Sequence, residues 1–189
     1  GEPYLVWHDG PDFSAFRDEW MADPRAVDRM LRQGLTERDP LAAEAAGTLH
    51  LSDGQRETYV AILREAIRSA GGAFVIRCAD SLRQLTGSPV WANEIVVVLL
   101  GDEHWGVRID AAILLSRFPP TVELIAALMR SVQDEEYLVR YHSANTLLGW
   151  AGRPREISED PEYFPLLVAE NSPQKWSIVA AGLAGSASA

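Results

Sequence analysis

The feature of this chain that most constrains its fold is a segment that recurs five times. The five copies align without an internal gap, and each begins at an apolar residue: Leu41, Phe74, Val107, Val139 and Trp176. The copies start 33, 33, 32 and 37 residues apart, and each has alanine five positions after its start: Ala46, Ala79, Ala112, Ala144 and Ala181. A near-constant period of this length is typical of stacked-repeat proteins. The function of such a chain is then expected on a surface that the repeats build, rather than in a catalytic motif.

Positions 0, +4, +8 and +11 of each copy are spaced so that they share one stripe of an α-helix. The residue at +4 is small in every copy: Ala45, Cys78, Ala111, Ser143 and Ala180. Small residues at +4 and +5 let a neighbouring helix backbone approach closely. The stripe is therefore predicted to be buried, and the register places Cys78 and Trp150 in the core.

A partner helix is predicted upstream of each alanine-bearing helix. Capping residues, proline in the first turn and glycine after the last turn mark these helices. They are expected over residues 23–34, 55–68, 88–100 and 120–130, with a last one beginning at Asp160-Pro161. No segment alternates apolar and polar residues over the length of a strand. The prediction is an all-α protein made of helix-turn-helix units.

These units organise residues 1–189 as one α-solenoid domain. Residues 23–184 hold about five repeats, and the low-complexity tail 185–189 is expected to fray. Residues 1–22 lie outside the repeat and are rich in aromatic side chains. A short helix over residues 12–21 would bring several of them together as a terminal cap, while the alternative is an aromatic recognition arm. The aromatic residues of this segment are Tyr4, Trp7, Phe13, Phe16 and Trp20.

Two copies carry a more specific pattern. An acidic residue, Asp102 or Asp134, is followed five residues later by a Val-Arg pair, Val107-Arg108 or Val139-Arg140, and then by small residues and leucine. These segments resemble HEAT repeats, and in particular the short bacterial kind named after phycobilisome lyases. The other three copies depart from the pattern, with Ala42, Val75 and Ser177 in place of the arginine. The resemblance implies a right-handed α-solenoid whose second helices line a concave, partner-binding side.

Composition narrows the class of partner. The chain has 17 basic and 27 acidic residues, a net charge of −10. This excess disfavours a nucleic-acid backbone or an anionic membrane and suits a basic protein, although acidity can also serve solubility alone. A single cysteine excludes an internal disulfide, and neither a signal peptide nor a membrane-length apolar run is found. We expect a cytoplasmic protein.

Enzyme classes of similar architecture lack their motifs here. Deoxyhypusine-hydroxylating HEAT-like proteins hold iron with repeated His-Glu pairs, which this chain does not contain, and its four histidines are scattered. HEAT-like DNA glycosylases use a basic groove with aromatic residues and an aspartate. This chain contains Trp105, Asp110 and Trp150, but its only lysine is Lys175, so the basic stripe that such a groove needs is missing. Neither a Gly-x-Ser-x-Gly elbow nor a glycine-rich phosphate loop is present. We predict a protein that is not an enzyme and holds no metal or cofactor.

The concave side is predicted from positions +2, +3, +6 and +9, which point away from the buried stripe. Ile109, Ile113, Tyr141 and Leu148 are expected to be exposed there as an apolar centre with a polar rim, as in protein interfaces. The alternative is that these apolar residues pack against the N-terminal segment. The candidate partner-binding residues are Arg77, Asp80, Ile109, Asp110, Ile113, Tyr141, His142 and Asn145.

The function predicted from these observations is a non-catalytic protein-binding module that uses the concave face. Its most concrete form is a bacterial immunity protein that neutralises a basic toxin. A scaffold or regulatory subunit with several weak clients, such as a lyase-like chaperone, is the alternative. A HEAT-like DNA glycosylase is the least favoured reading.

Overall fold

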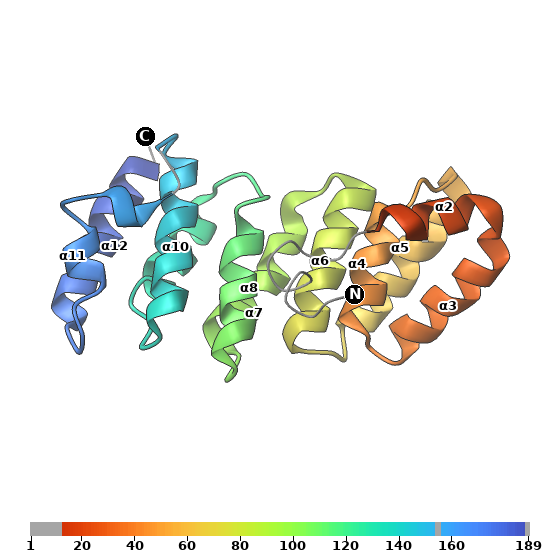
Figure 1. The fold of residues 1–189 in the computed structure, drawn as a ribbon, viewed down its shortest axis with the longest axis horizontal. Helices are drawn as coiled ribbons and strands as arrows, with labels where there is room; N and C mark the ends of the chain where they lie inside the picture. Colours follow the sequence, from red (N-terminus) through yellow and green to blue (C-terminus); the bar gives the residue numbers. More distant parts are fainter. Residues whose placement is uncertain (1–12, 154–155, 188–189) are drawn as a thin grey trace. The chain divides into compact units, whose positions relative to one another are not determined.

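A computed structural model describes residues 13–153 and 156–187 of the chain. Helices make up 76% of the structure, and the described residues contain no strand, which confirms the all-α prediction. The chain divides into two compact units, residues 1–88 and 89–189, and each is described by itself (Figure 1). The prediction that they form one continuous domain stays a prediction. None of the described helices combines the length and apolar character that crossing a membrane requires.

The first unit consists of two helical hairpins and one preceding helix. Its helices are α2 (Ser14–Ala22), α3 (Pro24–Thr36), α4 (Pro40–Thr48), α5 (Asp53–Ile67) and α6 (Gly72–Thr86). Helix α3 pairs with α4 and α5 pairs with α6, and the hairpins stack because α4 packs on α6 and α3 on α5. Helix α2 packs on α3.

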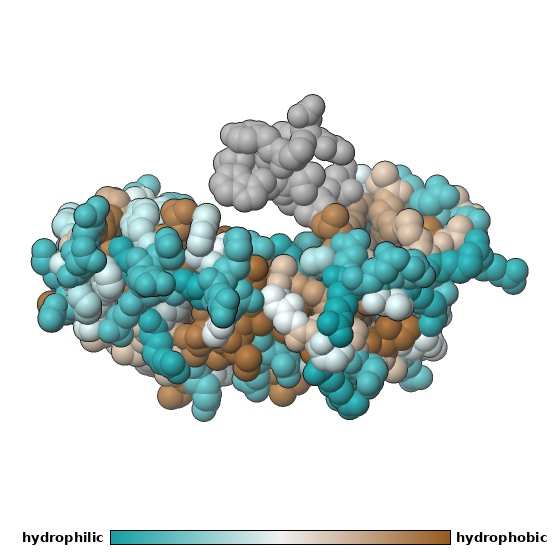
Figure 2. Space-filling view, turned by 90° about the horizontal axis from the view of Figure 1, so that it is seen from below, coloured by the Kyte–Doolittle hydropathy of each residue, from teal (hydrophilic) through white to brown (hydrophobic). Residues whose placement is uncertain are grey.

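The second unit repeats this arrangement. Its elements are η1 (Pro89–Trp91), α7 (Ala92–Gly101), α8 (Trp105–Leu115), α9 (Val122–Ser131), α10 (Tyr137–Trp150), η2 (Ile157–Glu159), α11 (Phe164–Leu167) and α12 (Pro173–Ala187). The alanine-bearing helices α8, α10 and α12 pack side by side, while their partners α7 and α9 pack on each other (Figure 1). Figure 2 shows one face of the molecule, on which hydrophilic residues predominate and apolar residues gather in smaller groups.

Local signals explain where the helices begin and end. The Asp23 side chain accepts a hydrogen bond from the N–H of Ala26 at the start of α3 (3.0 Å), and Gln55 accepts one from the N–H of Ser52 at the start of α5 (3.0 Å). Helix α6 ends at Thr86 and is capped by Gly87, whose φ of 69° is the left-handed conformation that glycine adopts without strain. Helix α11 begins at Phe164 rather than at the predicted Asp160-Pro161, and Pro165 lies in its first turn.

The helix expected over residues 88–100 is divided into η1 and α7, so this predicted boundary is wrong. Helix α12 continues to Ala187, and the expected fraying of residues 185–189 stays a prediction. Of the predicted N-terminal cap or arm, the structure describes residues 13–22, in which Ser14–Ala22 form helix α2 and Trp20 is buried. Tyr4 and Trp7, within residues 1–12, lie outside the described residues, as do residues 188–189.

The buried stripe is largely confirmed. Four of the five repeated alanines are fully buried, and so is Cys78, where burial raises the pKa of the thiol to about 12. Ala181 is exposed, because α9, α10 and α11, which pack on α12, leave this side of the helix open. Leu41 is 48% exposed, since it lies in the first turn of α4 and lines an open cavity with Phe13 and Phe16. Trp150, predicted as core, is only half-buried.

Gly47 allows the closest approach between α4 and α6. A Cβ atom placed at Gly47 would lie 2.8 Å from Cα and 2.5 Å from Oγ of Ser81, whose hydroxyl donates to the carbonyl of Ala43 (2.6 Å). Gly47→Ala should force the helices apart and lower the free energy of unfolding by about 1–3 kcal/mol, measured by urea denaturation. Gly54→Ala, on α5 with open space around it, is the matched control and should not destabilise. Equal stabilities of both variants would contradict the close-contact explanation.

Candidate functional site

The structure brings five of the eight predicted site residues together on one surface of the second unit. This surface, called here the α8–α10 face, consists of Asp110, Ile113 and Ser116 of α8 with Tyr141, His142, Asn145 and Thr146 of α10. Five of these seven residues, Ile113, Ser116, His142, Asn145 and Thr146, line a cavity of about 180 Å³. Ile113 is 42% exposed. The exposed Ile113 side chain thus lies at the edge of a small cavity that is lined mostly by polar residues.

The repeat register explains why these residues meet. The stacking alanines Ala112 and Ala144 are fully buried, and the Thr146 hydroxyl donates to the carbonyl of Ala112 (2.9 Å). These contacts hold α8 and α10 in register, so equivalent positions of the two repeats become neighbours. Asp110 and His142 both occupy position +3, and the Asp110 carboxylate acts electrostatically on the His142 ring.

His142 lies in a partly buried, acidic environment. Burial lowers the pKa of His142, while the carboxylates of Glu156 and Asp110 raise it to a smaller extent. Because the net pKa lies below the ordinary value of 6.5, the ring is neutral at neutral pH. The Tyr141 ring meets the His142 ring edge-on, with 5.3 Å between centroids. A neutral imidazole can donate or accept a hydrogen bond at this surface without adding positive charge.

The segment after α10 folds back onto this face and was missed by sequence reasoning. The Asn145 side-chain oxygen accepts a hydrogen bond from the N–H of Ile157 (2.7 Å), and the Tyr141 hydroxyl donates to Glu156 (2.5 Å). Ile157 is fully buried. Asn145 and Tyr141 therefore hold a loop as well as lining the face. No periodic position marks Glu156 or Ile157, so the repeat could not reveal them.

Several residues predicted to be exposed on the concave side are buried, which corrects the prediction. Ile109 is 9% exposed and Leu148 is buried. The buried stripe of these helices is therefore wider than the predicted positions 0, +4, +8 and +11. Asp80, in the first unit, is 2% exposed. Its carboxylate accepts hydrogen bonds from Arg83 (3.0 Å) and Gln84 (3.1 Å) on its own helix. Asp80 and Ile109 are thus packing residues in this structure.

Arg77, the remaining predicted residue, belongs to the first unit. Its guanidinium forms an ion pair with Glu44 across α4 and α6, with 3.5 Å between Nε and Oε2. Both side chains are largely buried. Arg77 therefore links two stacked helices.

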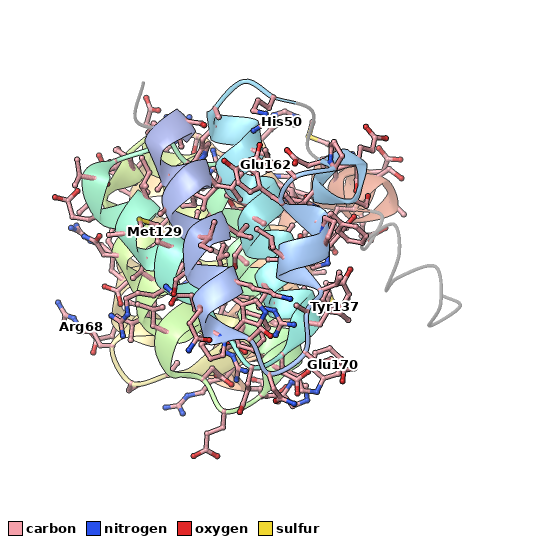
Figure 3. The ribbon with its side chains drawn as sticks, turned by 90° about the vertical axis from the view of Figure 1, so that its left-hand side faces the viewer. His50, Arg68, Met129, Tyr137, Glu162 and Glu170 are labelled. Atoms are coloured by element: carbon pink, nitrogen blue, oxygen red, sulfur yellow. The ribbon has the colours of Figure 1, made fainter. Side chains whose placement is uncertain are left out.

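Two exposed aromatic residues, Trp105 and Tyr137, lie in the first turns of α8 and α10 and were not among the predicted partner-binding residues. Each stands two residues before the start of its copy, and Tyr137 is labelled in Figure 3. Trp105 stacks on His104, with 5.9 Å between ring centroids, and Tyr137 lies 5.9 Å from the Tyr141 ring. Their common place in the repeat is the sequence signal that could have identified them. Exposed aromatic rings of this kind are common anchors in protein interfaces.

The Val-Arg motif has a structural role. Arg108 binds Asp134 with two parallel contacts of 2.9 Å and donates to the carbonyls of Asp102 (2.8 Å) and Glu103 (3.2 Å). The paired carboxylate raises the pKa of Arg108. A bidentate guanidinium with two further acceptors is well satisfied inside the protein. Arg108 therefore holds its own hairpin turn and the next one.

Arg140 repeats this contact pattern with different partners. It donates to the carbonyls of Asp134 and Glu135 (both 2.8 Å) and of Leu167 (3.2 Å). Its guanidinium lies 4.0 Å from the centroid of the Trp176 ring, a cation–π contact. Burial lowers the pKa of Arg140. The aromatic ring here takes the place that the carboxylate occupies beside Arg108.

The described acidic, histidine and cysteine side chains do not cluster as a metal site would require. Within residues 13–153 and 156–187, no group of three or more His, Cys, Asp or Glu side chains could hold a metal ion. Asp102, Arg108 and Asp134 line a cavity of about 480 Å³, but the Arg108 guanidinium is already bound to acceptors of the two hairpin turns.

Comparison with protein-family models, curated proteins and solved structures found no match to this chain.

Proposed function

We propose that this chain is a non-catalytic protein-binding module and that its α8–α10 face contacts the partner. The observation that carries the proposal is the exposed Ile113 beside a cavity whose walls include His142 and Asn145. An apolar centre with polar neighbours and nearby exposed aromatic rings is the usual composition of a binding surface. The fixed register of α8 and α10 supplies the rigidity that such a surface needs.

The proposed fold behind this function is a right-handed α-solenoid of about five HEAT-like repeats. The support is the pairing of each alanine-bearing helix with an upstream helix, and the stacking of successive pairs within each unit. The sequence resemblance in residues 102–115 and 134–148 points the same way. We place the protein in the cytoplasm, in keeping with its single, buried cysteine.

The charge of the second unit favours a basic partner. Residues 89–189 contain 13 acidic and seven basic residues, a net charge of −6. Two of the basic residues, Arg108 and Arg140, are buried in the hairpin turns. An acidic surface accelerates association with a cationic protein and disfavours nucleic acid. The most specific form of the proposal is a bacterial immunity protein that sequesters a basic toxin.

The test is isolation of a one-to-one complex from the source cells, followed by calorimetry with the purified partner. Ile113→Asp should raise the Kd by about tenfold or more, because it places a charge in the apolar centre. Ile178→Asp, at a 57% exposed position of α12, is the control and should leave the Kd unchanged. Equal effects of the two substitutions, or recovery of nucleic acid alone, would count against the proposal. Several weakly bound proteins would instead favour the scaffold or regulatory-subunit alternative.

A further inference from the structure

Successive repeats are joined by a contact that recurs in both units. The Ser81 hydroxyl of α6 donates to the carbonyl of Ala43 in α4 (2.6 Å), and the Thr146 hydroxyl of α10 donates to the carbonyl of Ala112 in α8 (2.9 Å). Both hydroxyls occupy position +7 of their copies, whereas the acceptors occupy +2 and +5 of the preceding copy. These helices therefore have one side, around +2 and +5, that receives the next repeat, and another, around +7, that meets the previous one.

The last copy leaves its receiving side open. Ile178 and Ala181 occupy positions +2 and +5 on α12, and both are exposed, Ile178 by 57%. The equivalent residues of the first copy, Ala43 and Ala46, are fully buried. Helix α12 packs on α9, α10 and α11, and a Cβ atom at Gly185, about one turn further along the open side, would meet no neighbour. The second unit thus ends in a stacking surface that, in the first copy, the next helix covers.

The first copy leaves the opposite side open. Positions 0 and +4 share a side of the helix with +7. Leu41, at position 0 of α4, is 48% exposed, whereas Phe74 and Val139 at the same position are buried. Leu41 and Ala45 line a cavity of about 350 Å³ whose residues are mostly apolar. Thr48 carries the hydroxyl at +7, but it donates to the Ala45 carbonyl of its own helix (2.9 Å). Among the described residues, no earlier copy supplies an acceptor for it.

We propose that the last repeat of one molecule stacks on the first repeat of a second copy, with Ile178 and Ala181 of α12 against the α4 surface around Leu41. The two open surfaces are the two halves of the contact that joins repeats within the chain. Tyr163 lies against Gly182 and borders the α12 surface, so the incoming helix is expected on the Ala181 side. Because the two halves belong to different repeats, the contact is heterologous and adds molecules head to tail. It lies outside the α8–α10 face and is independent of the proposed function.

The first experiment is sedimentation equilibrium of the full-length chain over a range of protein concentrations. The expected result is a weight-average mass that rises with concentration from the monomer value of 20.8 kDa to beyond that of a dimer. Because each molecule carries a net charge of −10, added salt should strengthen the association by screening the repulsion between copies. A wild-type chain that stays monomeric at every concentration would overturn the proposal and would leave residues 1–12 as the candidate that covers Leu41.

The second experiment uses two substitutions at exposed positions to distinguish a head-to-tail contact from a symmetric one. Leu41→Glu and Ala181→Glu should each abolish self-association when studied alone. An equimolar mixture should form a heterodimer that grows no further, because the first variant keeps its α12 surface and the second keeps its α4 surface. Val122→Glu, at a 79% exposed position of α9, is the control and should associate as the wild type does. A mixture that stays monomeric, or association that only one substitution abolishes, would overturn the pairing of α12 with α4.

Discussion

The Arg140→Ala variant should lose about 3–5 kcal/mol of unfolding free energy, the largest effect expected for any single substitution in the second unit. Arg140 is 3% exposed and is the donor for the carbonyls of Asp134, Glu135 and Leu167. Truncation leaves these acceptors without their donor in the interior. It also removes the group that stacks on Trp176. Guanidinium chloride unfolding followed by circular dichroism measures the loss.

Two further variants show whether the guanidinium itself is responsible. Arg140→Lys keeps the charge but lacks the planar fork, so it should recover only part of the stability. Arg130→Ala removes an exposed arginine from α9 and should change stability by less than about 0.5 kcal/mol. If Arg140→Lys were as stable as the wild type, the positive charge and not the fork geometry would be the stabilising element.

The second large effect is expected for Asp134→Ala, at about 3 kcal/mol or more. Removal of this carboxylate leaves the Arg108 guanidinium buried without its negative partner. The substitution also removes the acceptor for the N–H of Glu136, which Asp134 binds at 2.9 Å. Chemical denaturation of the variant gives the sum of the two losses.

Asp102→Ala separates these two contributions. Asp102 occupies the equivalent position of the preceding repeat and accepts a hydrogen bond from the N–H of His104 at 2.8 Å, much as Asp134 does from Glu136. Among the described residues, Arg108 forms its ion pair with Asp134. The difference between the two variants therefore measures the ion pair. Equal losses would show that Asp134 acts only through the turn hydrogen bond.

The repeat predicted the helices well because burial on one stripe is a local property of sequence. The alanines Ala46, Ala79, Ala112 and Ala144 are buried as the spacing requires. The same register gives Asp110 and His142 the equivalent position +3 on α8 and α10, and the Asp110 carboxylate acts electrostatically on the His142 ring. Burial of the alanines follows from helix geometry and from the close stacking of neighbouring helices.

Exposure on the other side of the helices was predicted less well, because it depends on which neighbouring helix or loop packs against each side chain. Asp80 is buried although it stands at +6, and Ile109 is buried at +2. Residues 151–163 follow no period, so their contacts with Tyr141 and Asn145 could not be derived from the repeat. The sequence pattern identified both Arg108 and Asp134, but it did not predict their contact, because they lie 26 positions apart in the chain.

The contact between Arg108 and Asp134 also affects how such a chain can change over time. The turn that joins α9 to α10 is completed by an arginine from the preceding hairpin. The unit that must be inherited intact is therefore displaced from the helical hairpin and runs from α8 of one repeat to the start of α10 in the next. Deletion of the α9–α10 hairpin at its own boundaries would leave the buried Arg108 without its anion, whereas an exchange made along the displaced boundaries would preserve the pair.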